Sequence, residues 1–148
     1  MRYRERLSVP LWWWLPGLGL AALIALEVNQ GVRVLPDWVA YAVLLPVAAV
    51  ALVALGRTEL RVVSGGGDTE LWVGDAHLPV SAIARSAAVP RTAKSAALGR
   101  QLDPAAYVVH KAWVGPMVLV VLDDPEDPTP YWLVSSRRPE KVLAALRA

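Results

Sequence analysis

Two long uncharged segments near the N-terminus constrain this chain more than any other feature. Val9–Leu26 holds 18 consecutive residues without a charge, and Trp38–Gly56 holds 19. As α-helices these segments would be about 27–29 Å long, which is close to the ~30 Å hydrocarbon thickness of a bilayer. Burying both in a soluble protein would need a larger partner domain than the roughly 90 remaining residues supply. We therefore predict a transmembrane hairpin.

A cleaved signal peptide is the main alternative for the first segment. Signal peptides have a shorter apolar core and end at a small-residue cleavage site. Here the segment ends in Leu26-Glu27-Val28-Asn29-Gln30, and a second apolar segment follows closely. We therefore expect transmembrane helices at residues 9–28 and 38–56, joined by an external loop at residues 29–37.

The basic residues around the two segments predict their orientation. Cytoplasmic flanks of membrane spans carry an excess of Lys and Arg. We therefore expect a multi-pass plasma-membrane protein with both termini cytoplasmic, so that residues 1–8 and residues 57–148 lie on the same side. Neither segment contains Asp, Glu, Lys, Arg or His, which argues against a transport site. The flanking arginines are Arg2, Arg4 and Arg6 before the first segment, Arg33 alone between the two, and Arg57 and Arg61 after the second.

Beyond residue 57 the pattern changes to that of β-strands. Short β-branched runs alternate with Gly, Pro and Asp clusters, and Pro139 is placed to open a terminal helix whose apolar face would cover a sheet. The predicted fold class is membrane α+β: a two-helix transmembrane hairpin, then a small antiparallel β domain resembling a pleckstrin-homology-like barrel, with a C-terminal helix. The uniformly apolar Met117–Leu122 should be a central strand. The expected strands are Thr58–Val63, Thr69–Val73, His77–Ile83, Tyr107–Trp113, Met117–Leu122 and Tyr131–Ser135.

Composition excludes several function classes. The chain has no cysteine, so it can form no disulfide, thiolate metal site or cysteine nucleophile. Residues 57–148 contain 11 basic and 10 acidic residues. Nucleic-acid binding needs a concentrated basic face, so we expect no nucleic-acid partner.

No catalytic motif is evident. Ser135 and Ser136 do not stand in a G-x-S-x-G turn, and Gly65–Gly67 is not followed by G-K-[ST]. We therefore predict no enzyme, no catalytic residue and no cofactor.

Two clusters of metal-ligand residue types can be weighed against structural roles. The acidic loop around Asp127 has oxygen ligands suited to Ca²⁺ or Mg²⁺, but it lacks EF-hand spacing, and its prolines favour an ordinary turn. His77 and His110, with Asp75 nearby, lack any known metal-site spacing. We therefore predict no metal site. The loop carboxylates are Asp123, Asp124, Glu126 and Asp127.

Five residues are candidates for binding a partner or ligand. Arg137 and Arg138 precede the terminal helix, where guanidinium groups beside a helix N-terminus can bind a phosphate or a carboxylate. Trp113 and Trp132 fall in predicted strands, where they would fill the core or, if exposed, anchor a protein partner. Asp127 in the acidic loop is a candidate for partner recognition.

Three parts of the chain form a recognisable combination. They are the Tyr3–Pro10 opening before two apolar segments, L-D-P-A-A-Y-V-V-H-K-A-W at Leu102–Trp113, and D-D-P-E-D-P-T-P-Y-W-L-V-S-S-R-R-P at Asp123–Pro139. In this combination nearly the whole chain resembles a family of actinobacterial membrane proteins known as domain of unknown function 3093. The resemblance implies a plasma-membrane location in an actinobacterium and a two-span layout, and it implies no activity. The layout is also similar to bacterial membrane proteins in which a helical hairpin precedes a pleckstrin-homology-like domain.

An anchor without polar residues joined to a small domain without catalytic residues indicates a non-catalytic task. We expect a membrane-anchored adaptor or scaffold that presents the β domain at the cytoplasmic face and binds a protein partner besides the lipid bilayer. The alternative is a sensor that binds lipid headgroups or another ligand through a basic edge.

Overall fold

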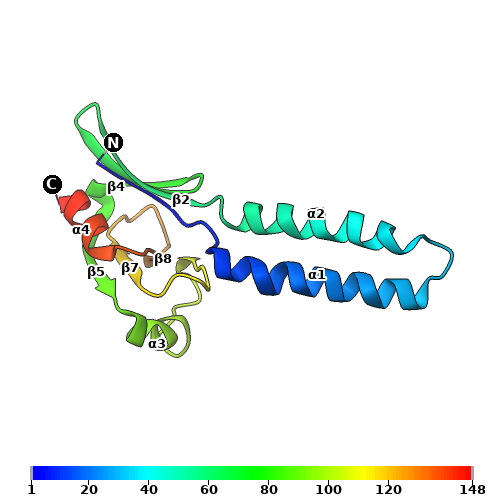
Figure 1. The fold of residues 1–148 in the computed structure, drawn as a ribbon. Helices are drawn as coiled ribbons and strands as arrows, with labels where there is room; N and C mark the ends of the chain where they lie inside the picture. The colour runs from blue at the N-terminus through cyan, green and yellow to red at the C-terminus, as the bar shows by residue number, and fades with distance from the viewer. Residues whose placement is uncertain (1, 148) are drawn as a thin grey trace. The chain divides into compact units, whose positions relative to one another are not determined.

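The computed structural model describes residues 2–147, which divide into two compact units (Figure 1). One unit comprises Ser8–Arg57 and contains both apolar segments. The other combines the residues up to Leu7 with those from Thr58 onward. The second unit is therefore built from two stretches of chain that flank the first.

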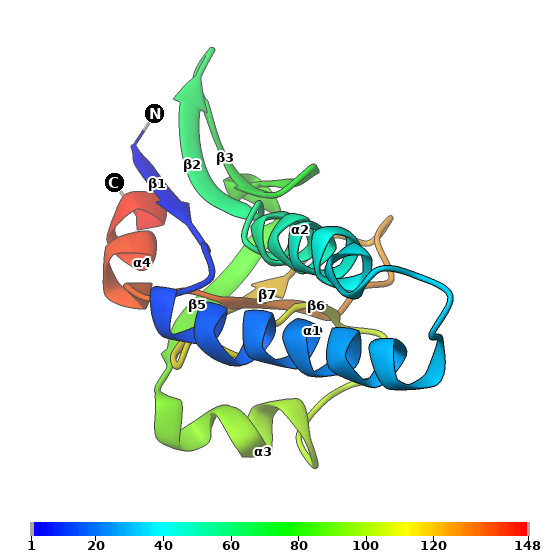
Figure 2. The ribbon, with the colours of Figure 1, turned by 45° about the vertical axis from the view of Figure 1, so that its right-hand side comes forward.

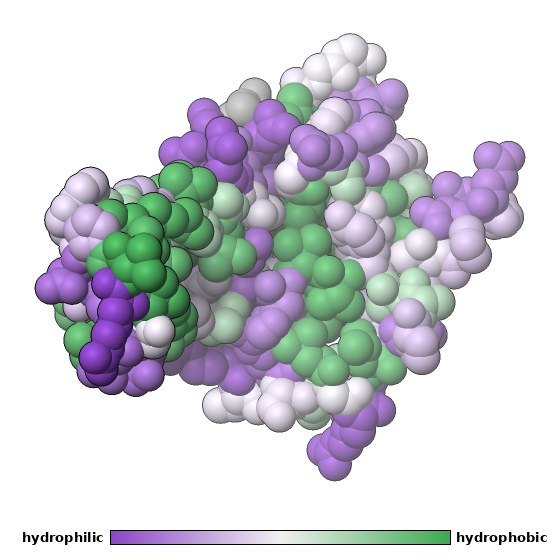
Figure 3. Space-filling view, turned by 90° about the vertical axis from the view of Figure 1, so that its right-hand side faces the viewer, coloured by the Kyte–Doolittle hydropathy of each residue, from purple (hydrophilic) through white to green (hydrophobic). Residues whose placement is uncertain are grey.

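The first unit is a hairpin of two long helices, α1 (Leu11–Gly31) and α2 (Asp37–Leu55). Both are long and apolar enough to cross a membrane, and only 11% of the most apolar window of each is buried. A core helix of a soluble protein would be mostly buried, whereas these helices expose many large hydrophobic residues along their length. Figure 3 shows hydrophobic side chains in green on the side of the molecule that faces the viewer. The two helices are therefore candidate membrane spans.

Small residues form the contact between the two helices. Ala21 and Ala25 of α1 are buried, as are Ala40 and Leu52 of α2. At Gly17 an added Cβ would lie only 3.0 Å from the Leu52 side chain. Gly17, Ala21 and Ala25 recur every four residues and thus lie on one face, which lets the helix backbones approach closely.

The second unit begins with an antiparallel sheet in the order β1-β2-β3-β4. The β2–β3 connection is a two-residue turn at Gly66-Gly67, with φ values of 62° and 92° that suit glycine. The sheet is an antiparallel meander as the sequence suggests, extended by one strand, but the predicted strand His77–Ile83 is wrong beyond Pro79. There the chain leaves the sheet through a short helical turn, and Ile83 begins a strand of the second sheet. The strands of the first sheet are β1 (Tyr3–Arg6), β2 (Glu59–Gly65), β3 (Asp68–Val73) and β4 (Ala76–Pro79).

Strand β1 is the main departure from the expected layout. The sequence predicts no strand before the first helix, but Tyr3–Arg6 pairs with β2 in the register Tyr3↔Val62 to Arg6↔Glu59. The Leu7 amide continues this ladder by donating to the Thr58 carbonyl (3.0 Å). The helical hairpin is thus an insertion between two adjacent, paired strands.

The second sheet has the order β5-β7-β8-β6, and its central strands are β7 (Met117–Leu122) and β8 (Tyr131–Ser135). The central position predicted for Met117–Leu122 is confirmed. The edge strands are β5 (Ile83–Val89) and β6 (Tyr107–Val109). The expected all-antiparallel arrangement is wrong for β6, which runs parallel to β8. The chain reverses between β6 and β7 and again between β7 and β8, so β6 and β8 have the same direction.

The two sheets and helix α4 (Pro139–Arg147) enclose one hydrophobic core. Helix α4 packs against β5 and β1, as Figure 2 shows, and it buries Val142, Leu143 and Leu146 as its sequence pattern predicts. Among residues 2–147 the strands form two separate sheets, and no closed barrel is detected. Short helical segments at Val80–Ala82 (η1), Arg91–Ala93 (η2) and Lys94–Leu98 (α3) connect the strands.

Candidate binding groove

A groove lies on the face of the second sheet that points away from the core. Side chains alternate between the two faces of a strand. Val118 and Val120 of β7, with Trp132 and Val134 of β8, therefore fill the core, while the residues between them line the groove. Its floor is formed by Arg85, Ala87 and Val89 of β5, Leu119 and Val121 of β7, and Tyr131 and Leu133 of β8.

The wall of the groove comes from the segment that follows β5. Pro90, Ala93 and Ala97 supply small apolar surfaces, and together with the floor they enclose about 530 Å³. This volume lies in the range of small-ligand sites. The wall is fixed in place by Lys94, whose ammonium group donates to the Lys111 carbonyl (3.3 Å) and to the Val114 carbonyl.

Burial of the Lys94 ammonium group, together with the nearby Arg91 charge, lowers the pKa of Lys94. The Arg91 guanidinium lies so close to Gly115 that a Cβ at position 115 would collide with it. These contacts connect the short α3 segment to the loop before β7. They therefore fix the position of the groove wall relative to the strands of the floor.

A β-bulge in β5 aims Arg85 into the groove. Ile83 pairs with Leu122 and Arg85 with Val121, so β5 carries one extra residue, Ala84, at this point. Without the bulge Ile83 and Arg85 would share a face, but Ile83 packs against the core whereas Arg85 lines the groove. Bulges of this kind re-aim side chains and are enriched next to functional sites.

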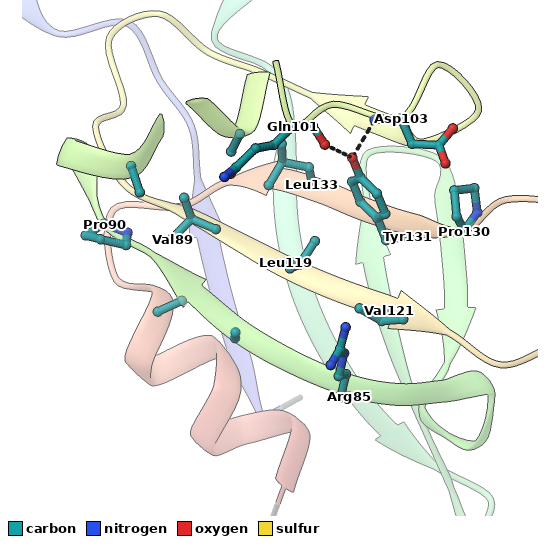
Figure 4. A pocket seen from close by; sticks show the side chains of 14 residues that line it. Arg85, Val89, Pro90, Gln101, Asp103, Leu119, Val121, Pro130, Tyr131 and Leu133 are labelled. Carbon is teal, nitrogen blue, oxygen red and sulfur yellow. Dashed lines mark hydrogen bonds between the residues drawn. The ribbon is translucent and has the colours of Figure 1, made fainter. Parts of the chain in front are cut away.

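The polar atoms at the opposite side of the groove bond to one another. The Tyr131 hydroxyl accepts a hydrogen bond from the Asp103 amide (2.8 Å) and donates to the Gln101 carbonyl (3.4 Å). The Asp103 carboxylate accepts from the Ala105 amide (2.9 Å). Figure 4 shows Arg85 and Asp103 on opposite sides, with Leu119 and Val121 between them. Within residues 2–147, no hydrogen bond or ion pair involves the Arg85 guanidinium.

A second polar cluster joins β1 to the segment before α4. The Glu5 carboxylate accepts hydrogen bonds from the Tyr3 hydroxyl (3.0 Å), the Ser136 hydroxyl (2.7 Å) and the Arg137 amide (2.6 Å). Burial of the Tyr3 hydroxyl, reinforced by the adjacent Glu5 carboxylate, raises the pKa of Tyr3 to about 12. Because Ser136 is fully buried, this cluster is part of the internal structure of the domain.

The two predicted arginines sit at this cluster. Arg137 and Arg138 are candidates for binding an anion, and the carboxylate found at the Arg137 amide belongs to Glu5 of the same chain. The Arg137 guanidinium donates to the Arg6 carbonyl (2.9 Å). The Arg138 amide donates to the Ser136 hydroxyl, and the Arg138 carbonyl accepts from the first turn of α4. Arg137 and Arg138 are both exposed.

The other three predicted binding residues are spread over the domain. Trp132 is only 7% exposed and packs in the core, with its ring 4.7 Å from that of Tyr107. Trp113 is half-buried and its indole donates to the Leu7 carbonyl (3.3 Å). Asp127 accepts from the Thr129 amide and so stabilises a turn. The structure therefore brings Trp113 and Arg137 to the neighbouring residues Arg6 and Leu7 and leaves Trp132 and Asp127 elsewhere.

The residues weighed as metal ligands have structural contacts. In the acidic loop Asp124 accepts from the Glu126 amide, as Asp127 does from Thr129. His77 stacks on Trp72, with 4.5 Å between ring centres. Over residues 2–147 no group of three or more His, Asp or Glu side chains is arranged to hold a metal ion.

The groove was not anticipated from the sequence, although one signal pointed to it. Met117–Leu122 is apolar at every position, and such strands are covered on both faces. One face of β7 packs on the core, and the other is the groove floor. Arg85 was missed because it lies in β5, where the sequence pattern predicts a strand only as far as Ile83.

Together these features define a class of protein: a small two-sheet domain interrupted, between two paired strands, by an apolar helical hairpin. The chain belongs to the family described as Protein of unknown function (DUF3093), whose model matches residues 2–146. This match confirms the family resemblance that the sequence motifs indicate. No curated protein and no solved structure matches the chain.

Proposed function

We propose that this protein is a non-catalytic adaptor that the helical hairpin anchors in the plasma membrane, with both termini and the β domain in the cytoplasm. The observation that carries the proposal is the pairing of β1 with β2. This pairing requires both ends of the hairpin to lie on the same side of a membrane, and a hairpin that crosses twice meets that requirement.

Charge and surface support the same arrangement. The exposed hydrophobic surface of α1 and α2 is suited to lipid. Arginines flank the β-domain side of the hairpin, and only Arg33 lies in the connection, which favours a cytoplasmic β domain under the positive-inside rule.

The buried serines support a non-catalytic role. The Ser136 hydroxyl is bonded to Glu5, and the Ser135 hydroxyl accepts from the Lys111 amide (2.9 Å). Both side chains are fully buried, so they serve the domain's internal structure.

We further infer a pleckstrin-homology-like layout and an actinobacterial source. Two packed, mostly antiparallel sheets with one C-terminal helix support the first inference, and the parallel β6 departs from it. The second rests on the sequence resemblance.

Headgroup sensing is the second candidate, and the contacts of Trp113 and Arg137 favour it. Their partners, Leu7 and Arg6, are close in sequence to Leu11, the first residue of α1. Four residues of extended chain span at most about 14 Å. Trp113 and Arg137 thus contact the stretch of chain that leads directly into the first apolar helix, and Trp and Arg side chains are stabilised at the headgroup layer of a membrane.

Extraction of the protein in native-lipid nanodiscs tests both candidates. An adaptor should copurify with one protein in a fixed ratio, and recovery of the chain alone at native expression level would argue against it. A headgroup sensor should instead be enriched in anionic lipid. This enrichment should fall in the double variant Arg137→Gln/Arg138→Gln and should remain unchanged in Arg100→Gln, a matched control on an exposed loop.

A further inference from the structure

We propose that the groove on the second sheet binds a single acyl chain that carries a carboxylate, with the carboxylate at Arg85. This inference rests on one part of the proposed function, the attachment to the membrane, because a membrane is where the domain would meet such ligands. The groove residues belong to one compact unit, so the site does not depend on how that unit is placed relative to the hairpin.

The floor of the groove offers a ligand apolar contact and almost no hydrogen bonding. Strands β7 and β8, at the centre of the floor, each pair with a neighbour on both sides, so their backbone groups are already used; the edge strand β5 uses the side facing β7 and is free only on the side away from the floor. The polar atoms around Tyr131 are satisfied by Gln101 and Asp103. An extended peptide would bring backbone donors and acceptors that find no partners here, and burying them unpaired is costly. An acyl chain carries no such groups.

Charge sets the direction of the ligand. Within residues 2–147 the Arg85 side chain has no hydrogen-bonding or ionic partner, although a β-bulge turns it toward the groove. A carboxylate can bind a guanidinium through two parallel hydrogen bonds. At the opposite side the Asp103 carboxylate would repel an anion (Figure 4). The anionic end therefore lies at Arg85 and the chain runs over Leu119 and Val121.

The volume of the groove limits the ligand to one acyl chain. A volume of about 530 Å³ is in the range that holds a small ligand, and the small side chains of Ala93 and Ala97 in the wall leave space for an acyl chain along the groove. A phospholipid with two acyl chains would leave one chain outside in water. A single-chain carboxylate is the occupant that matches both the space and the charge.

Photo-crosslinking of the full chain in phosphatidylcholine nanodiscs tests this site. The probe is a fatty acid with a diazirine in its acyl chain, and its methyl ester serves as the uncharged comparison. We expect saturable adducts in the peptides of β5, α3 and β7. Arg85→Gln should lower the adduct yield of the acid about tenfold, equivalent to about 1.4 kcal/mol, and should leave that of the ester unchanged. Arg100→Gln is the matched control, since Arg100 is exposed outside the groove.

A second variant blocks the groove without touching the core. Ala87 is exposed on the groove floor, so Ala87→Trp should abolish adducts of both acid and ester. Ala144→Trp, at an exposed position of α4, should leave them unchanged. Adducts confined to α1 and α2, an unchanged acid yield in Arg85→Gln, or crosslinks from the groove to a second protein chain would each overturn the proposal. Failure of the chain to enter nanodiscs would instead refute membrane anchoring, and groove binding would then be measured in solution with the same two probes.

Discussion

Replacing residues 8–57 by an Asn-Gly dipeptide is expected to give a soluble protein with an intact β domain. The register of β1 and β2 places Leu7 opposite Thr58, and the Leu7 amide already donates to the Thr58 carbonyl. A two-residue loop is the standard connection between such positions, and Asn-Gly suits its type I′ turn. Size-exclusion chromatography without detergent and a cooperative urea transition would verify the result.

The contrasting variant begins at Thr58 and therefore lacks β1. It removes Leu7, which is fully buried, and the Glu5 carboxylate that the Ser136 hydroxyl and the Arg137 amide use. Loss of a buried leucine alone costs about 2–5 kcal/mol. It also leaves the edge of β2 unpaired, which promotes aggregation. We expect an unfolded or aggregated product, and equal stability of the two proteins would show that β1 is dispensable.

Glu5→Ala is expected to destabilise the full chain by about 2–4 kcal/mol, because it leaves two partly buried hydroxyl groups without their acceptor, and each such group costs about 1–3 kcal/mol. These groups are the Tyr3 hydroxyl and the Ser136 hydroxyl; the exposed Arg137 amide can bond to water instead. Denaturant unfolding of the β domain, followed by hydrogen exchange at β2 and α4 in nanodiscs, measures the change.

Two companion variants make the Glu5 result specific. Glu126→Ala removes an exposed carboxylate from the acidic loop and should change stability by less than about 0.5 kcal/mol. The Ser136 hydroxyl donates to the Glu5 carboxylate, so Glu5→Ala and Ser136→Ala each remove the same hydrogen bond. The sum of the stability losses of the two single variants should therefore exceed the stability loss of the double variant. Strict additivity would mean that the two side chains do not interact in solution.

The elements that sequence predicted well are those whose signal is local. Two uncharged runs of helical length predicted α1 and α2, and the spacing of Val142, Leu143 and Leu146 predicted the buried face of α4. Strand β1 has no such signal. Its four residues Tyr-Arg-Glu-Arg are mostly charged, and they become a strand only through pairing with β2, which is distant in sequence.

The groove could not be predicted from the sequence because it, too, depends on contacts between distant parts of the chain. Whether the second apolar face of Met117–Leu122 is covered or open depends on the path of residues 90–106, which no periodic pattern fixes. The orientation of Arg85 depends on a one-residue bulge, and a single extra residue reverses the face on which a side chain lies. Arg137 was correctly seen beside a helix N-terminus, but the anion nearest its backbone proved to be Glu5 of the distant N-terminus.

The central claim is that the hairpin crosses the membrane and leaves the β domain on the cytoplasmic side. The chain has no cysteine, so single cysteines report on one position each. Val34→Cys lies in the connection between α1 and α2, where Val34 is 93% exposed, and Ala144→Cys lies on the exposed side of α4. With a membrane-impermeant maleimide, Val34→Cys should be labelled in intact cells and Ala144→Cys only after permeabilisation. Labelling of both positions from the same side of the membrane would contradict the account.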